Sequence, residues 1–536
     1  MCANNSPRYF YLIINFLLLI AVSIYAQPTE QWASRYNSPA NSTDNAKYMT
    51  VDNSGNVIVT GVSAGGNDLT TVKYSPTGAE MWASTHSTTG ADFPCGIAAD
   101  NSGNIIIGGT DFQANYNWVI IKYNSAGNIQ WIQHHNGAAN RHDYAQAMIC
   151  DANGNIYISG SVEKSTTGTF ELVTIKYNSS GVFQWTNRTD VVYPYVFDMK
   201  LDPSGNVYLC GALSSTNTNA FLAKVSNGGT LLFLQTYDNT PFAAEDSFYS
   251  LGMNNSGSEI FVTGRSWGGN TLKFDCVTAK YNSSGVSQWV QRYNGLGSGD
   301  DRGFSLVIDN SGNVYSAGES YGGVSAGRDI AIAKYSSSGT PLGFQRYTLG
   351  DEDEGAYKIR MDASQNFYLA GFSNSDILVL KYNNALTLQW IKKYNGPAND
   401  DDGPSDMMLD NTGNIYVTGT SKGIGTNYDY VTIKYSQTVG LNQISTDIPT
   451  EYSLSQNYPN PFNPSTTIKF DIPNEANVKI TVYDMLGKEV KVLADEFTQA
   501  GSYEVNFDAS MLSSGTYFYK LTADSFNDIK KMVLVK

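Results

Sequence analysis

The segment "DNSGNVIVTG" (52–61) is the first of eight similar stretches in a chain of 536 residues. Each stretch starts with Asp, or Asn in the fifth copy, turns through small polar residues, and ends with a short apolar run and a Gly. The later copies begin at residues 100, 151, 202, 254, 309, 362 and 410. A second motif follows each copy, as in "VKYSPTGAEMW" (72–82). This period indicates an array of similar units that bury apolar surface against one another.

Each unit carries the pattern of four short strands. A half-buried segment ends at the Asp, a turn leads to the apolar run, a loop leads to the strand ending in "KY", and a second turn enters a strand that contains Trp in most units. Both turns carry Asn, Ser and Gly where a positive φ is needed, which is typical of hairpins. Eight units of about fifty residues predict an all-β fold, an eight-bladed β-propeller.

The stretch "QWASRYN" (31–37) resembles "MWASTHS" (81–87), the last strand of the first unit, although no unit precedes it. The last unit, in contrast, lacks a Trp strand, because its repeat pattern stops after "TIKY" (432–435). We therefore expect residues 31–37 to form the outer strand of the eighth unit. This N-terminal strand would close the propeller and pair its last free edge.

The repeat elements also match a known pattern. The pairing of an Asp-x-x-Gly-Asn-x-Tyr-Val-Thr-Gly element with an Asp-x-x-x-x-Lys-Tyr strand resembles the bacterial SBBP β-propeller repeats over residues 31–435. The resemblance implies a secreted or surface-displayed propeller and brings no catalytic residue with it. We expect the propeller domain to span residues 27–435 and a polar linker to span 436–450.

The composition changes after the linker. The segment "NYPNPFNPSTTIKFDIP" (457–473), together with "VKITVYDMLGKEVKVL" (478–493) and "KKMVLVK" (530–536), resembles the type A C-terminal sorting domain of the type IX secretion system. Alternating apolar residues predict six or seven strands in residues 451–536, in a small Ig-like β-sandwich. The resemblance implies recognition by the type IX machinery, export across the outer membrane, and cleavage with release or attachment at the cell surface.

Residues 1–26 carry the features of a secretory signal peptide. Arg8 is their one charged residue, an apolar run covers 9–26, and Ala26 precedes a plausible cut. An uncleaved membrane anchor is the alternative. No other stretch is apolar enough to cross a bilayer, so we expect no stable membrane span once the signal is removed.

Charge and cysteine content restrict the partners. The net charge is −15, which disfavours nucleic acid and anionic membranes. Four cysteines outside the signal fall in different repeats without CxxC spacing, and we favour small buried residues over disulfides, whose status the sequence leaves open. They are Cys95, Cys150, Cys210 and Cys276.

Loop lengths distinguish two faces of the expected propeller. The spans that contain the hairpin turns are nearly constant in length, whereas the other two spans of each unit vary. The variable loops should emerge together on one face, and recognition residues usually lie on such loops. Ligand-binding candidates are the residues that break the repeat pattern there, namely Arg265, Trp267, Tyr321, Tyr116 and Trp118. Aromatic side chains near amides suit a polysaccharide or protein ligand.

Acidic residues also recur on the variable face. One set stands eight positions before the turn Asp: Asp44, Asp92, Asp143, Asp246, Asp301, Glu354 and Asp402, with Pro194 in the fourth unit. Paired carboxylates suggest a glycosidase, but a residue present in nearly every unit is better interpreted as a loop cap that accepts backbone N–H bonds. We expect the repeated Lys of "KY" to place its charge near these carboxylates or in solvent.

Neither metal ligands nor a catalytic group stand out. His86, His134 and His135 occupy positions filled by Tyr or Arg elsewhere, so we interpret them as repeat variants and predict no metal site with His142. Asp400, Asp401 and Asp402 suggest a weak calcium site, although a solvated acidic loop is the simpler interpretation. No Gly-x-Ser-x-Gly motif, Cys/His pair or phosphate loop occurs.

The sequence therefore predicts a non-catalytic, exported binding or structural module without a cofactor, calcium aside, located extracellularly or on the cell surface. The main alternative is an oxidoreductase, because the spacing of "KYNSSGVSQW" (280–289) is similar to the Trp-docking repeats of eight-bladed quinoproteins. Those enzymes usually carry an adjacent Cys pair, which this chain lacks. A carbohydrate hydrolase is a weaker alternative.

Overall fold

The computed structural model describes residues 27–164, 168–214, 217–239, 245–268, 273–295, 299–323, 327–349, 352–411, 413–436, 441–445, 447–509 and 512–536. The expected signal peptide, 1–26, lies outside the described residues. Within them the chain forms β-strands joined by turns and loops, with no helix. No helix in this described part is therefore long and apolar enough to cross a membrane.

Eight four-stranded antiparallel sheets lie between residues 29 and 436 of the described chain. We name them sheets 1 to 8. Sheet 1 consists of β2 (Asn45–Val51), β3 (Val57–Ser63), β4 (Asp68–Tyr74) and β5 (Glu80–His86), and sheet 2 consists of β6 (Phe93–Ala99), β7 (Ile105–Phe112), β8 (Tyr116–Tyr123) and β9 (Ile129–His135). Sheet 3 consists of β10 (Asp143–Cys150), β11 (Ile156–Glu163), β12 (Phe170–Tyr177) and β13 (Phe183–Thr189), and sheet 4 consists of β14 (Pro194–Leu201), β15 (Val207–Ser214), β16 (Thr218–Val225) and β17 (Leu231–Tyr237).

Sheets 5 to 8 follow the same order, except that the last sheet borrows the N-terminal strand. Sheet 5 consists of β18 (Asp246–Met253), β19 (Glu259–Trp267), β20 (Phe274–Asn282) and β21 (Ser287–Tyr293), and sheet 6 consists of β22 (Asp301–Ile308), β23 (Val314–Gly323), β24 (Gly327–Tyr335) and β25 (Pro341–Tyr347). Sheet 7 consists of β26 (Glu354–Met361), β27 (Phe367–Ser373), β28 (Asp376–Tyr382) and β29 (Leu388–Tyr394), and sheet 8 consists of β30 (Asp402–Leu409), β31 (Ile415–Lys422), β32 (Tyr428–Ser436) and β1 (Thr29–Tyr36).

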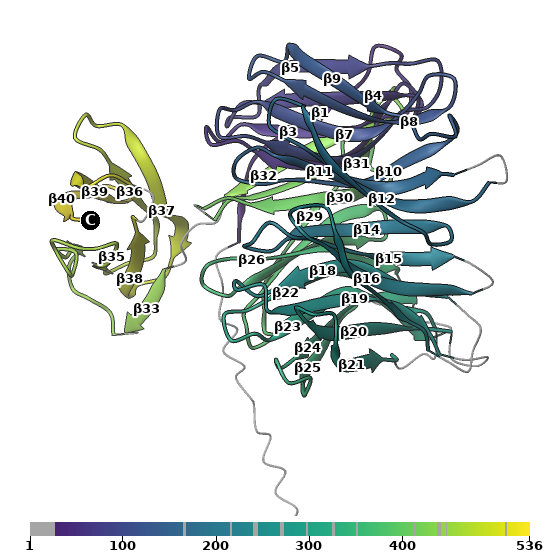
Figure 1. The fold of residues 1–536 in the computed structure, drawn as a ribbon. Coiled ribbons are helices and arrows are strands. Elements are labelled where there is room, and N and C mark those ends of the chain that lie inside the picture. The colour runs from purple at the N-terminus through teal and green to yellow at the C-terminus, as the bar shows by residue number, and fades with distance from the viewer. Residues whose placement is uncertain are drawn as a thin grey trace, which may run out of the picture.

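Strand β1 completes sheet 8, which confirms the predicted pairing of the N-terminal Trp strand with the last repeat. Trp32 lies opposite Lys434, and Tyr36 lies opposite Tyr430. The first strand of each sheet contacts the first strand of the next, and β30 contacts β2, so the sheets close into a propeller-like ring. Figure 1 shows this ring from its side. Apolar side chains fill the space between sheets: one cluster joins Val57 and Val72 of sheet 1 to Tyr416 of sheet 8.

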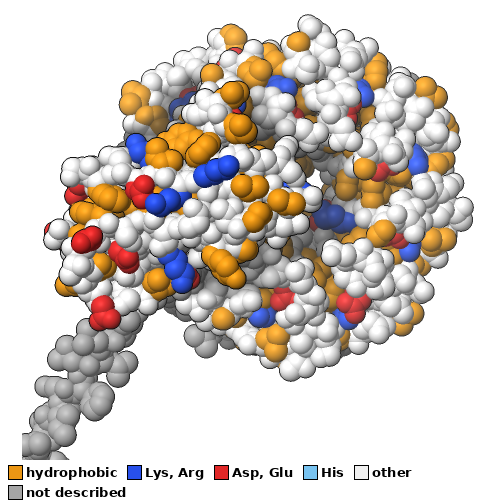
Figure 2. Space-filling model, turned by 90° about the vertical axis from the view of Figure 1, so that its left-hand side faces the viewer, with side chains coloured by type: hydrophobic (Ala, Val, Ile, Leu, Met, Phe, Trp, Pro, Cys, Tyr) orange, Lys and Arg blue, Asp and Glu red, His pale blue; other side chains and the backbone are white. Residues whose placement is uncertain are grey.

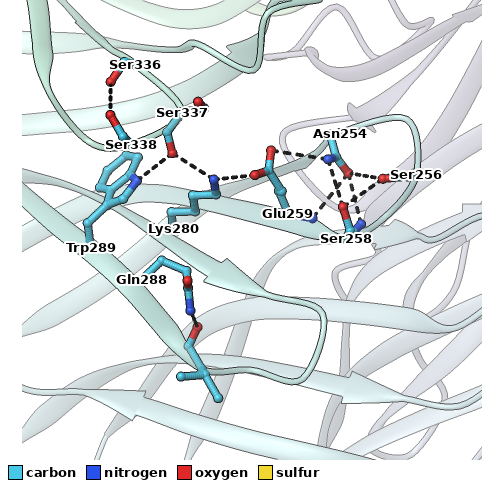
Figure 3. A network of polar contacts seen from close by, with 11 residues as sticks. Asn254, Ser256, Ser258, Glu259, Lys280, Gln288, Trp289, Ser336, Ser337 and Ser338 are labelled. Atoms are coloured by element: carbon cyan, nitrogen blue, oxygen red, sulfur yellow. Dashed lines mark hydrogen bonds and ion pairs between the residues drawn. The ribbon is translucent and has the colours of Figure 1, made fainter.

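The outer strands hold neighbouring sheets together through a repeated contact (Figure 3). Trp289 of sheet 5 donates its indole N–H to the carbonyl of Ser337 in the second hairpin turn of sheet 6, at 3.1 Å. Lys280 donates to the same carbonyl at 2.8 Å and pairs with Glu259 at the first turn of its own sheet. Equivalent Trp bonds run from Trp32 to Pro76, Trp82 to Ser125 and Trp185 to Asn227.

The Lys of the "KY" motif was expected beside the recurring carboxylates of the variable face. That expectation is wrong, because the Lys lies at the other end of the sheet. Lys73 pairs with the turn carboxylate of Asp52 at 2.9 Å, and Lys122 pairs with Asp100 at 3.0 Å. The Lys and the turn Asp meet because both lie at the end of the sheet where its hairpin turns are. The buried ammonium group gains a carboxylate there and a carbonyl of the next sheet.

The C-terminal unit consists of two further sheets around one core. Their strand orders are β33-β38-β35-β34 and β37-β36-β39-β40. The strands are β33 (Asn442–Ser445), β34 (Ser453–Leu454), β35 (Ser465–Ile472), β36 (Ala476–Tyr483), β37 (Glu489–Thr498), β38 (Gly501–Asp508), β39 (Gly515–Ala523) and β40 (Phe526–Leu534). The predicted apolar face is buried, including Phe470, Ile480 and Val505. Strand β33 lies within the segment expected to be a linker and pairs with β38.

The four cysteines in the described part of the chain are free thiols. Cys95, Cys210 and Cys276 are buried and Cys150 is half-buried. Burial raises the pKa of the Cys276 thiol to about 11, which keeps it protonated and unreactive at neutral pH. The favoured interpretation as small buried side chains is confirmed for Cys95, Cys210 and Cys276.

Candidate ligand-binding face

The ring has two different faces, as the loop lengths predict. Sheets 1 to 7 are meanders, so the first and third connections of each sheet lie at one end of its strands and the second connection lies at the other. Sheet 8 lacks the third connection because β1 is its outer strand. The hairpin turns, such as 52–56 and 75–79, form one face, which we call the turn face. The longer loops form the opposite face, the loop face. Strand β32 ends at the turn face, so the chain leaves for the C-terminal unit on that side of the ring (Figure 1).

Every innermost strand contains a β-bulge at the same repeat position. The register shifts between Ala145 and Ala147 in β10, and between Val196 and Asp198 in β14, with equivalent shifts in the other six strands. A bulge leaves one residue unpaired and redirects its side chain, and bulges are frequent beside functional sites. The bulged residues are Lys47, Cys95, Gln146, Phe197, Tyr249, Phe304, Tyr357 and Ser405.

Four consecutive bulged residues are aromatic and form a continuous wall. We call Phe197, Tyr249, Phe304, Tyr357 and the adjacent Phe372 the aromatic arc. Successive ring centroids are 5.0, 5.8, 5.5 and 5.5 Å apart. Phe197 is 46% exposed and Tyr357 is 38% exposed. An aromatic surface of this length, contributed by sheets 4 to 7 and left open to solvent, is suited to contact a ligand.

The arc borders the central cavity of the ring, which has a volume of about 520 Å³. All eight innermost strands line the cavity, and its charged side chains include Asp198, Lys200, Lys358, Arg360 and Asp406. Asp406 pairs with Arg360 at 3.3 Å and also accepts the backbone N–H of Met49 at 3.2 Å, which links sheet 8 to sheet 1. Figure 2 shows the hollow from the turn-face side, with basic side chains at its wall.

Two further cavities adjoin the arc and the central cavity. One of about 460 Å³ is lined by Phe93, Tyr144, Phe170, Tyr193 and Tyr195, and it shares Gln146 with the central cavity. Tyr195 is 51% exposed. The other, of about 200 Å³, begins at Tyr357 and Phe372 and is lined by Asp401, Asp402 and Tyr428. Aromatic side chains therefore extend along the loop face on both sides of the central opening.

The recurring carboxylates cap loops, as predicted. Asp44 accepts the N–H of Ser38 at 2.6 Å and that of Ala64 at 3.0 Å. Asp143 accepts the N–H groups of Gly137 and Glu163 at 2.5 and 3.0 Å. Equivalent bonds are made by Asp92, Asp246, Asp301, Glu354 and Asp402. Each carboxylate is thus used to hold the loop that enters its sheet, which explains its repetition without invoking catalysis.

Arg265 lies next to the aromatic arc. Its guanidinium stands 6.0 Å from the Tyr249 ring centroid and 4.3 Å from that of Phe274, and it pairs with Glu245 at 2.6 Å. Trp267 packs edge-on against Phe274 and is half-buried. Two of the predicted residues are therefore brought together around Phe274, and Arg265 also lies beside Tyr249.

The other predicted residues are separate from the arc. Tyr321 is half-buried over Gly299. Tyr116 packs in a cluster with Phe93, Phe112 and Tyr144. Trp118 is 1% exposed, so its expected place among exposed aromatics is wrong. Its register position turns the indole into the core between sheets 2 and 3.

The acidic loop does not gather its three carboxylates. Asp402 caps Gly396, Asp401 accepts the hydroxyl protons of Ser375 and Tyr428, and Asp400 bonds the next backbone N–H. Among the described residues, one cluster brings at least three potential metal ligands together, and it consists of His86, Asp111 and His134. The imidazole Nε2 atoms lie 3.1 and 2.9 Å from Asp111 Oδ2. The sequence pattern led us to dismiss these histidines as repeat variants.

Residues 456–536 match the family model described as "Secretion system C-terminal sorting domain". This segment is a type IX sorting domain, so the protein interacts with the type IX machinery and is exported to the outer-membrane surface or the extracellular space. The family match covers the tail alone. Among curated proteins, no match to the chain is found.

Similar solved structures share little sequence with this chain. A protein of unknown function from Bacteroides caccae is 14% identical, with 57% of this chain and 94% of that chain covered and a TM-score of 0.31. The β-propeller domain of the Trilobed protease from Pyrococcus furiosus is 8% identical, with 65% and 95% covered and a TM-score of 0.37. An ulvan lyase is 12% identical, with 82% and 91% covered and a TM-score of 0.35. These similarities carry no inference about activity.

Proposed function

We propose that this protein is an exported, non-catalytic binding module that holds an extracellular polysaccharide on its loop face. Residues 27–435 act as an eight-bladed β-propeller of the SBBP type, closed by the N-terminal strand. The tail, 451–536, acts as a detachable Ig-like sorting domain, to which β33 of the preceding segment adds an edge strand, and residues 1–26 act as the signal peptide.

The aromatic arc is the observation that carries the proposal. Sugar rings present C–H faces that pack on aromatic rings, and their hydroxyls need polar partners at the rim. The arc offers both: three of the four bulged aromatic residues line the central cavity, Tyr357 continues the row, and charged pairs lie beside them. Arg302 pairs with Glu319 at 2.9 Å, and Arg265 flanks Tyr249.

The outer-strand Trp residues need no cofactor to explain them. Four of them donate the indole N–H to a carbonyl in the second hairpin turn of the next sheet, namely Trp32, Trp82, Trp185 and Trp289. The likeness to quinoprotein repeats is therefore accounted for by packing between sheets, and no contact in the described chain favours an oxidoreductase over a binding module. The recurring carboxylates are likewise accounted for by loop capping, so their repetition gives no support to a hydrolase.

A polysaccharide binding screen tests the proposal. The mature chain is run in affinity electrophoresis gels that contain neutral or acidic polysaccharides, with and without calcium. We expect retardation by at least one neutral polysaccharide, because the chain carries a net charge of −15 and acidic polymers are repelled. Unchanged migration with every polysaccharide, together with capture of an outer-membrane protein by the same chain, would assign the face to a protein ligand instead.

A further inference from the structure

The cluster of His86, Asp111 and His134 arises where three repeat positions change at once. The position of His86, four residues after the outer-strand Trp, holds Tyr in five of the other units. The position of His134 holds Arg or Lys in five, and the position of Asp111 holds Ser in five. In sheet 5 the ordinary arrangement is Arg292 donating to the hydroxyl of Ser266 at 3.0 Å. Packing therefore does not require this combination of residues.

The three side chains present their ligand atoms to one point. The Nε2 atoms of both histidines face the same oxygen, Oδ2 of Asp111, and all three atoms lie within 4.8 Å of one another. Asp111 is fully buried, and its second oxygen, Oδ1, has no hydrogen-bond partner. The side chain of His134 is 36% exposed, so the cluster is reached from solvent.

Two imidazoles and a carboxylate form a donor set that suits zinc. Zn²⁺ binds imidazole nitrogen and carboxylate oxygen at about 2.0–2.2 Å, which places tetrahedral ligand atoms about 3.4 Å apart. The present separations of 2.9 and 3.1 Å need only a small outward movement of the exposed His134 and of His86. Nearby carboxylates of Asp92 and Asp68 act on His86 electrostatically and add negative charge that favours a dication.

We propose that His86, Asp111 and His134 bind a zinc ion at the loop-face end of the interface between sheets 1 and 2. The ion takes three protein ligands and leaves a fourth position open to solvent or to a donor atom of a bound ligand. Because His86 belongs to β5 and the other two residues belong to β7 and β9, the ion also links two neighbouring sheets. The site is distinct from the aromatic arc, so it stands whether or not a polysaccharide binds there.

Metal titration of the mature chain tests this site. After treatment with a chelator and dialysis, Zn²⁺ binding is measured by calorimetry, and Co²⁺ is added separately as a spectroscopic probe. We expect one equivalent of Zn²⁺, a tetrahedral Co²⁺ absorption band, and a Tm about 5 °C higher with excess Zn²⁺. Binding at this site should weaken by about 100-fold or more in His134→Gln, whose exposed position leaves folding intact.

His142→Gln is the matched control, because His142 contacts Tyr116 outside the cluster. It should bind Zn²⁺ as the natural chain does. Asp111→Asn should abolish binding, and circular dichroism reports whether this buried variant still folds. The proposal is overturned if His134→Gln retains full affinity, if His142→Gln loses it, or if the natural chain takes up no stoichiometric Zn²⁺ and shows no Tm increase.

Discussion

Trp32 lies opposite Lys434 in the pairing of β1 with β32, although the two residues stand at opposite ends of the repeat array. The indole N–H of Trp32 donates to the carbonyl of Pro76 in the second hairpin turn of sheet 1, at 3.0 Å. Arg35 of the same strand pairs with Asp429 at 2.9 Å. The N-terminal strand therefore binds the last sheet and the first, and much of the stability of the ring depends on it.

Deletion of residues 27–40 should open the ring. The variant would expose the edge of β32 and lose the contact between Trp32 and sheet 1, and free strand edges promote association between chains. We expect a lower Tm and soluble oligomers or aggregates in size-exclusion chromatography with light scattering. A monomeric variant with the Tm of the natural chain would contradict the role of β1.

The contact between Trp289 and the second hairpin turn of sheet 6 requires a glycine in that turn. Gly339 has φ +88°, and a Cβ atom at this position would lie 2.7 Å from the Trp289 ring. Gly339→Ala should therefore cost about 2–4 kcal/mol, from strain at positive φ and loss of packing. Gly425→Ala is the control, because Gly425 has φ +76° with open space around it, and it should cost only about 1 kcal/mol. Equal losses in urea unfolding would show that the Trp contact is unimportant.

The buried cap Asp143 should make stability depend on pH. Burial raises the pKa of its carboxyl to about 6, despite the two backbone N–H bonds that it accepts. The folded state then binds more protons than the unfolded state between about pH 4 and 6, so this group lowers the free energy of unfolding as pH rises. Relative to Asp143→Asn, the natural chain should lose about 2–3 kcal/mol between pH 4 and 7.

Urea unfolding at several pH values measures this difference. Asp190→Asn is the control, since it removes the same carboxylate from a side chain that is 84% exposed. A constant stability difference between Asp143→Asn and the natural chain over this range would contradict the prediction.

Passage across the outer membrane should depend on the tail. In a bacterium with a type IX system, removal of residues 456–536 should leave the protein inside the cell envelope, and fusion of that segment to a periplasmic reporter should export the reporter. Immunoblots of culture medium, surface-exposed protein and periplasm separate these outcomes. Export of the truncated chain at the natural level would show that another segment directs it.

The repeat period predicted the arrangement of strands because each unit repeats the same turns and apolar positions. The missing Trp strand after "TIKY" (432–435) likewise indicated the partner of residues 31–37. Loop capping by residues such as Asp44 was also predictable, since a carboxylate present in nearly every unit needs a structural cause.

The aromatic arc was not found because a bulge interrupts the two-residue alternation on which strand patterns depend. Aligning the repeats on the turn Asp would have revealed it, as four consecutive units carry an aromatic residue five positions earlier. Trp118 was misplaced because a residue at a loop end still takes its side-chain direction from the strand register. The histidine cluster combines residues from two sheets. Comparing the repeats one position at a time therefore does not reveal that these side chains meet.

The most direct test of the account compares the affinity of paired variants for the polysaccharide that retards the natural chain. Phe197→Ala with Tyr357→Ala removes both ends of the bulged run in the aromatic arc, while Phe183→Ala with Phe344→Ala removes two exposed aromatics from outer strands. We predict that the first pair weakens binding by about 30-fold or more, at about 1 kcal/mol or more per ring, and that the second pair binds as the natural chain does. Equal affinity of both variants, each folded by circular dichroism, would contradict the claim that the loop face binds its ligand through the arc.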